Sequence, residues 1–195
     1  MSTCTGADGN GVACTDLFFP FSYRCNKYDP KAAAAAASNA SGGVSAAASA
    51  EAAKAELNRY LFYYQRYHNH DQSSKFAQRQ QQQTEKRMTH LHAKSGGDAA
   101  WVEFSFLAAA TQQVLQCRSV LKYTYVFGYY LPDGAEKTLF EYLQQQLEAA
   151  TEHLSELSEL PPIDKLDRTA IVNYTRITEQ FCTNLIKGVE NGLVQ

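Results

Sequence analysis

The sequence predicts an all-α protein, an elongated antiparallel bundle of three to four long helices preceded by an irregular N-terminal segment. No proline occurs between Pro30 and Pro132, so long uninterrupted helices are permitted over that stretch. Apolar residues in the C-terminal half recur at spacings of three and four, as on one face of an α-helix. Turn signals such as Pro132-Asp133-Gly134 leave only a few residues between candidate helices, which favours antiparallel neighbours.

The first fifty residues show no clear helical period. Residues 1–30 are irregular and contain the aromatic segment DLFFPFSYRCNKYDP. Residues 31–50 are a low-complexity run of Ala, Ser and Gly, which carries too little side-chain area to order itself against a core. We interpret this run as a linker, although alanine has the highest helix propensity and can extend the helix that follows. The helical domain is expected over residues 51–195.

The first helix is expected over about residues 50–94. Leu57, Leu61 and Tyr64 have the i, i+4, i+7 spacing that predicts a core-facing stripe. Apolar residues almost vanish over residues 68–87, so we expect this half of the helix to be mostly solvent-exposed.

Three further helices follow. The second, about residues 99–131, begins after the N-cap candidate Asp98 and is apolar on several faces, which predicts a central position in the bundle. The third, about residues 135–160, carries leucines at alternating spacings of three and four. The fourth, about residues 164–190, has one apolar side comprising Leu166, Ala170, Tyr174, Ile177, Phe181 and Leu185.

Composition excludes several classes of protein. The formal net charge is only −2, so the overall balance indicates no nucleic-acid partner. The longest apolar stretch, residues 120–131, is interrupted by Lys122 and is too short for a membrane helix, which needs about 20 apolar residues. The first residues, MSTCTGADGNG, have no basic n-region and no long apolar core, so we expect no secretory signal there. Five scattered cysteines are typical of reduced thiols, so we expect a cytoplasmic or nuclear protein.

Candidate chemistry is sparse. The sequence contains none of the usual nucleotide-binding or hydrolase motifs. Histidines form H-x-H pairs at residues 68–70 and 90–92, but residues two apart on a helix point in different directions, so we expect solvated or capping histidines rather than metal ligands. Cys117 and Cys182 lie within helical patterns and are expected to be inert core residues.

Three strings carry a resemblance to a known family. They are RYLFYYQRYHNHDQSSKF, WVEFSFLAAATQQVLQCRSVLKYTYVFGYYL and LFEYLQQQLEAATEHLSE. Over about residues 57–156 the chain resembles the helical Ariadne domain of RING-between-RING ubiquitin ligases.

The resemblance extends in part to the end of the family's catalytic second RING. The segment FSYRCNKYD looks like its last residues, which places Cys25 as a remnant zinc ligand. Phe18 stands where the family has a histidine, and the catalytic cysteine with its flanking glycines has no counterpart in this sequence. We therefore expect no cofactor in this chain, zinc in the family's RING domains, and no enzymatic activity of the chain alone.

The resemblance also implies a mechanism and partners. In the family the Ariadne helices pack over the second RING, in cis, and mask its cysteine until a neddylated cullin-RING complex releases them. Phe76 matches the family's inhibitory phenylalanine, and Glu152 matches its inhibitory glutamate. Ala77 stands where the family often has a glutamate, which predicts a weaker clamp.

Other interpretations stay open from the sequence. From the residues alone, Phe76 is a single apolar residue on a helix and Glu152 is a solvated acid. The chain can be a stand-alone regulatory module acting in trans, or the C-terminal piece of a complete ubiquitin-protein transferase. It can also be an unrelated helical scaffold, or an RNA-binding bundle that uses the basic residues of the first helix.

Overall fold

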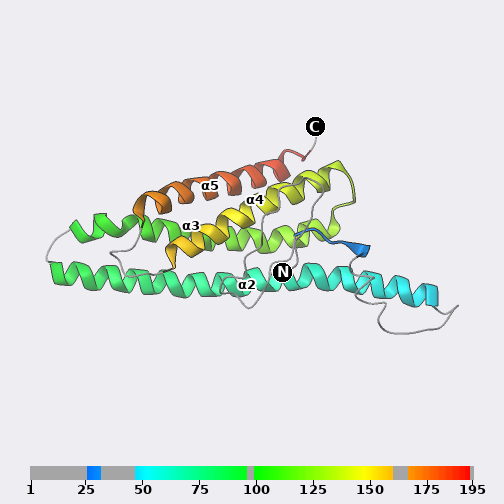
Figure 1. The fold of residues 1–195 in the computed structure, drawn as a ribbon, viewed down its shortest axis with the longest axis horizontal. Coiled ribbons are helices and arrows are strands. Elements are labelled where there is room, and N and C mark those ends of the chain that lie inside the picture. Colours follow the sequence, from blue (N-terminus) through cyan, green and yellow to red (C-terminus); the bar gives the residue numbers. More distant parts are fainter. Residues whose placement is uncertain (1–25, 32–46, 96–98, 160–166, 194–195) are drawn as a thin grey trace. The chain divides into compact units, whose positions relative to one another are not determined.

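A computed structural model describes residues 26–31, 47–95, 99–159 and 167–193. Its long helices are α2 (Ala47–Ser95), α3 (Ala99–Tyr130), α4 (Ala135–Ser158) and α5 (Arg168–Glu190) (Figure 1). The described ranges contain no strand, so the all-α prediction is confirmed. The predicted bounds differ from these by at most four residues, at the start of α5. Asp98 and Cys25 lie outside the described residues.

The chain divides into two compact units, residues 1–62 and 63–195. In the first unit, the Tyr28 hydroxyl donates to the carbonyl of Ala55 at 3.3 Å. The Tyr28 ring also meets the ring of Phe62 edge-on, with 5.3 Å between centroids. These contacts fix the short segment at residues 26–31 against the beginning of α2.

The second unit is an antiparallel bundle. Contacts between α2 and α3 run in opposite order along the two helices: Tyr67 with Tyr123, Asp71 with Lys122, and Gln81 with Gln112. The same holds for α3 and α4: Arg118 with Glu152, Tyr125 with Glu148, and Phe127 with Phe140. Figure 1 shows α3, α4 and α5 reversing direction at each turn. The predicted antiparallel order of neighbours is confirmed.

Local chemistry explains where the C-terminal helices begin and end. The Asp167 carboxylate accepts from the backbone N–H of Ala170 at 3.0 Å, and this caps the start of α5. Gly192, with φ of +76°, follows the end of α5 in the left-handed conformation that glycine adopts without strain. The turn between α3 and α4 is held by an ion pair between Lys137 and Asp133 at 2.6 Å.

Two apolar clusters form the core of the second unit. One contains Cys117, Leu121, Phe140, Leu147, Cys182 and Leu185. The other contains Ala77, Ala110, Val114, Leu154 and Ile171. Helix α3 contributes to both clusters and contacts the other three helices, which confirms its central position. The two predicted core cysteines are buried, as expected.

The predicted buried face of α2 is wrong. Leu57, Leu61 and Tyr64 are 54%, 39% and 50% exposed. The buried residues of α2 are Tyr63, His70, Ala77, Gln80, Thr84 and Met88, and most of them fall in the half that was expected to be solvated. Four of these six residues are small or polar, namely His70, Ala77, Gln80 and Thr84, so a search for apolar spacing selects another side of the helix.

The predicted face of the fourth helix is shifted by about one residue. The buried side chains of α5 are Ile171, Thr178, Cys182 and Leu185, whereas Ile177 is 38% exposed. Polar Thr178 takes a core position because its hydroxyl can donate to the carbonyl of Tyr174 at 2.7 Å on its own helix. Leu166 lies outside the described residues, and among the described members of the expected set Leu185 is the one that is fully buried.

Candidate functional site

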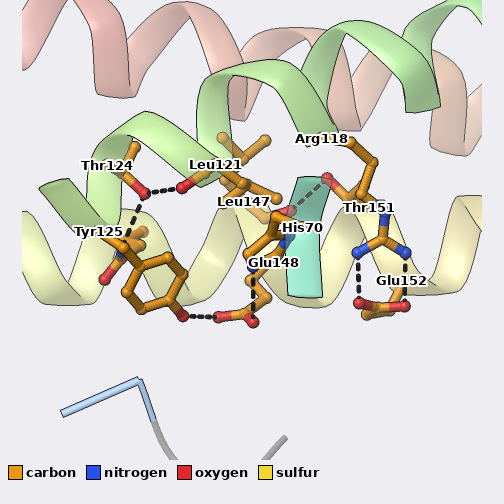
Figure 2. Close-up of polar contacts among 10 residues, drawn as sticks. His70, Arg118, Leu121, Thr124, Tyr125, Leu147, Glu148, Thr151 and Glu152 are labelled. Carbon is orange, nitrogen blue, oxygen red and sulfur yellow. Dashed lines mark hydrogen bonds and ion pairs between the residues drawn. The ribbon is translucent and has the colours of Figure 1, made fainter. Parts of the chain in front are cut away.

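A group of buried polar contacts lies where α2, α3 and α4 meet (Figure 2). Its first part is an ion pair between Arg118 on α3 and Glu152 on α4. The guanidinium donates through Nη1 to Oε1 at 2.5 Å and through Nη2 to Oε2 at 2.8 Å. Arg118 is 1% exposed, while 30% of the Glu152 side chain is exposed. This two-pronged geometry is the strongest form of Arg–carboxylate pairing.

The second part of the network centres on Glu148, one helical turn before Glu152. The Tyr125 hydroxyl donates to Glu148 Oε2 at 2.9 Å, and His70 Nε2 lies 3.3 Å from Oε1. Burial opposes ionisation of this carboxyl, but the hydrogen bond and charge of His70, with help from Tyr125 and Arg118, lower the pKa of Glu148 below its usual range. Glu148 is therefore a buried carboxylate that joins three helices.

Aromatic and amide groups complete the network. The His70 ring stacks on the Tyr125 ring with centroids 5.4 Å apart and planes 22° apart. The Gln144 amide donates to the Thr124 hydroxyl at 2.7 Å, and that hydroxyl donates to the carbonyl of Leu121 at 2.6 Å. Paired polar groups of this kind fix the register of α3 against α4, because a shift would leave buried polar groups without partners.

Charged residues also hold α2 against α3. Lys122 Nζ lies 3.1 Å from an oxygen of Asp71, and Lys75 lies 2.8 Å from the other oxygen. Hydrogen bonds from Lys75 and Lys122 lower the pKa of Asp71, and the hydrogen bond to Asp71 raises the pKa of Lys122. The ammonium of Lys122 also lies 5.0 Å from the centre of the Tyr123 ring. Helix α2 is thus joined to α3 by polar as well as apolar contacts.

Phe76, predicted as an inhibitory residue, lies at the surface. It is 40% exposed, which is high for a large apolar side chain. It borders a pocket of about 460 Å³ together with Arg79, Gln80, Gln83 and Glu159. Burial raises the pKa of the Glu159 carboxyl at the edge of this pocket. An exposed phenylalanine with a polar rim is a common arrangement at protein interfaces.

Ala77, the neighbour of Phe76, faces the core. It is 3% exposed and belongs to the core cluster that also contains Ala110, Leu154 and Ile171. A glutamate here would place a carboxylate among apolar side chains. The departure from the family pattern at Ala77 therefore coincides with a core position in this chain.

Glu152 is not the solvated acid that the residues alone indicate, because Arg118 holds both of its oxygens. Sequence reasoning missed Arg118, Tyr125 and Glu148. A signal was present: Arg118 is a charged residue on a helix that is apolar on several faces, and Glu148 and Glu152 are spaced i, i+4 on α4. Buried charges in such positions are almost always paired.

The histidines lie in different environments. His68 stacks on Tyr64 with 6.2 Å between ring centroids, at the surface of α2. His70 is fully buried beside Glu148, so the expectation of a solvated or capping histidine is wrong for this residue. Across the described ranges, no group of three or more His, Cys, Asp or Glu residues is placed to hold a metal ion. Over the same ranges no helix is long and apolar enough to cross a membrane.

Comparison with known proteins identifies the family. A family model of the Ariadne domain matches residues 58–195. The chain is 41% identical over 122 residues to the probable E3 ubiquitin-protein ligase rbrA of Dictyostelium discoideum, covering 56% of this chain and 23% of that protein. It is 40% identical over 139 residues to the E3 ubiquitin-protein ligase dbl4 of Schizosaccharomyces pombe, covering 71% of this chain and 25% of that protein.

A third relative extends the match. The chain is 35% identical over 173 residues to the E3 ubiquitin-protein ligase ariadne-1 of Drosophila melanogaster, covering 87% of this chain and 32% of that protein. The chain thus spans about a quarter to a third of the length of these relatives. The chain belongs to the Ariadne domain family of these E3 ubiquitin-protein ligases.

Proposed function

We propose that this chain is the regulatory and interaction module of an Ariadne-type RING-between-RING ubiquitin ligase. It masks the catalytic second RING, in cis or in trans, and a neddylated cullin-RING complex releases the mask. The observation that carries the proposal is that Phe76 and Glu152 are both accessible on a rigid helical unit, with Glu152 held in one orientation. Accessible groups on rigid elements are what a specific protein contact requires.

Phe76 would supply the apolar part of this contact. Its side chain is partly exposed on a long helix, so part of its surface is available to a partner. Burying the exposed part of a phenylalanine contributes roughly 1–2 kcal/mol to association. The polar residues around the adjoining pocket would form the rim that excludes water.

Glu152 would supply the polar part. Arg118 uses one side of the carboxylate, and a carboxylate accepts about four hydrogen bonds in total. Two accepting sites are thus left for a partner. Because Ala77 is buried, the mask would depend on two contacts rather than three and would be weaker than in relatives that have the glutamate.

The rest of the proposal concerns the complete protein. Ubiquitin transfer would belong to RING domains outside this chain, which would hold the zinc. Residues 1–30 would be the end of the second RING with Cys25 as its last zinc ligand, residues 31–50 a linker, and residues 51–195 the regulatory helical domain. The compartment would be the cytoplasm or the nucleus.

A chimera tests masking in cis. The matching region of Drosophila ariadne-1 is replaced by this chain, and discharge of ubiquitin from the ligase is measured. We expect low basal activity that rises when Phe76→Ala or Glu152→Ala is introduced. Matched controls are Tyr142→Ala, an exposed aromatic residue on α4, and Glu156→Ala, one turn beyond Glu152. Full basal activity in the unmutated chimera would contradict the masking function.

The partner is tested separately. Neddylated and unmodified cullin-RING complexes are added to the chimera, and both binding and ubiquitin discharge are followed. We expect the neddylated complex to bind and to raise the activity toward that of the Phe76→Ala variant. Binding to neither form would count against a cullin partner and would leave the masking test unaffected.

A further inference from the structure

Arg118 is unusual because its charge lies in the interior while its partner lies at the surface. The residue is 1% exposed, and the neighbouring positions of α3, Cys117 and Leu121, are both fully buried. Its two terminal nitrogens point at the carboxylate of Glu152, whose side chain is 30% exposed (Figure 2). A buried cation therefore supports a carboxylate that faces the outside of the bundle.

This arrangement fixes the direction of the carboxylate. Two parallel hydrogen bonds, at 2.5 and 2.8 Å, define the plane of the Glu152 carboxylate and the position of both oxygens. An unsupported glutamate on a helix surface samples several rotamers and loses that freedom when a partner binds. With Arg118 in place, most of that freedom is already lost in the free protein.

The pair also changes the charge that a partner would meet. Leaving the Arg118 guanidinium buried without its carboxylate is strongly unfavourable, so Glu152 stays paired when a partner covers it. The complex then buries the Arg118–Glu152 ion pair, which has no net charge, and not an isolated carboxylate. The outward sites of Glu152 suit a neutral donor, such as a backbone N–H or a side-chain amide of the partner.

We propose that Arg118 is a positioning residue for Glu152, which orients and neutralises the carboxylate so that the pair docks against the catalytic RING as one unit. This inference rests on the masking function proposed above. It assigns a role to a residue that touches no partner itself. In this role Arg118 would act on the RING contact through Glu152.

Basal ubiquitin discharge in the ariadne-1 chimera tests this assignment with two substitutions of Arg118. Arg118→Lys keeps the charge but loses the planar fork, and Arg118→Met loses both. Since ordering one side chain changes an affinity by about 2- to 10-fold, we expect Arg118→Lys to raise basal activity about that much and Arg118→Met to approach Glu152→Ala. Leu185→Val in the core, chosen to lower thermal stability by a similar amount, controls for loss of fold.

Dependence on Glu152 distinguishes positioning from a structural role. If Arg118 acts through Glu152, then Arg118→Met adds no further activity in a chain that already carries Glu152→Ala. A further rise in the double variant, or an equal rise in the stability-matched control, would overturn the assignment. If Glu152→Ala itself leaves masking intact, the proposed function of Glu152 fails. If Glu152→Ala relieves masking but neither Arg118 variant raises basal activity, only the positioning role fails.

Discussion

Restoring the family's glutamate at position 77 should unfold this protein more readily. The Ala77→Glu substitution adds one methylene group and a carboxylate to the cluster of Ala110, Val114, Leu154 and Ile171. Ala77 is 3% exposed, so the new side chain must either be buried or push α2 away from the bundle. An unpaired buried charge destabilises a fold by about 3–5 kcal/mol, and overpacking destabilises it by about 1–3 kcal/mol. Because α2 can shift to relieve part of both effects, the sum of the two is an upper limit on the loss of stability.

We therefore expect the free energy of unfolding to fall by about 3–5 kcal/mol and the melting temperature to fall by roughly 10 °C. Urea and thermal unfolding followed by circular dichroism measure both quantities. The matched control is Gln78→Glu, which adds the same charge at the neighbouring exposed position and should change stability by less than about 0.5 kcal/mol.

The pH dependence gives an independent check of the Ala77→Glu prediction. Burial would raise the pKa of the introduced carboxyl above its unfolded value of about 4.3. The folded state then keeps its proton to higher pH, so the destabilisation should be smallest below about pH 4 and should grow as pH rises. A variant as stable as the original protein at pH 7 would refute the assignment of Ala77 to the core.

Two further predictions concern groups in the interior. The lowered pKa of Glu148 stabilises the folded state at pH values above the unfolded pKa of about 4.3, and this stabilisation is lost as pH falls through the folded pKa. The free energy of unfolding should therefore fall less steeply in the Glu148→Gln variant than in the original protein between about pH 5 and pH 2. Urea unfolding at each pH measures this free energy. If the variant loses stability with acid as steeply as the original protein, Glu148 is not an ionised core group. Cys117 and Cys182 are both buried, so thiol reagents should label them only after unfolding, as read by peptide mass mapping. Contact with the Cys182 thiol and burial also raise the pKa of Cys117, which lowers its reactivity further. Rapid labelling of either residue in the native protein would contradict their core positions.

The helical fold was predictable because the pattern that defines it is local. In α4 the fully buried Leu147 and Leu154 belong to the stripe with spacings of three and four that identified the helix. In α3 the apolar residues on several faces of the helix predicted its central position from the sequence alone. Cys117 was placed in the core by the same reasoning, and it is fully buried.

The buried face of α2 was not predictable in this way. Tyr63, His70, Ala77 and Thr84 recur every seven residues, yet three of the four are polar or small and carry little hydrophobic signal. Their burial depends on partners elsewhere in the chain, such as Glu148 for His70. Polar side chains that are buried because a residue far away in the sequence pairs with them do not appear in the spacing of apolar residues along the helix.

The candidate site was half predictable. The family resemblance pointed to Phe76 and Glu152, and both prove accessible in the structure. It gave no indication of Arg118, because the ion pair joins residues 34 positions apart and depends on the register of α3 against α4. The sequence alone could not indicate that the glutamate is already held in a fixed direction.

Site-specific photo-crosslinking tests the masking function most directly. A benzoyl-phenylalanine is placed at Phe76 in the ariadne-1 chimera, and the crosslinked peptides are mapped by mass spectrometry. We expect crosslinks to the catalytic second RING that disappear when the neddylated cullin-RING complex is added, while the same probe at the exposed Tyr142 of α4 gives none to that RING. Crosslinks from position 76 that stay within the helical bundle, with and without the complex, would contradict the account.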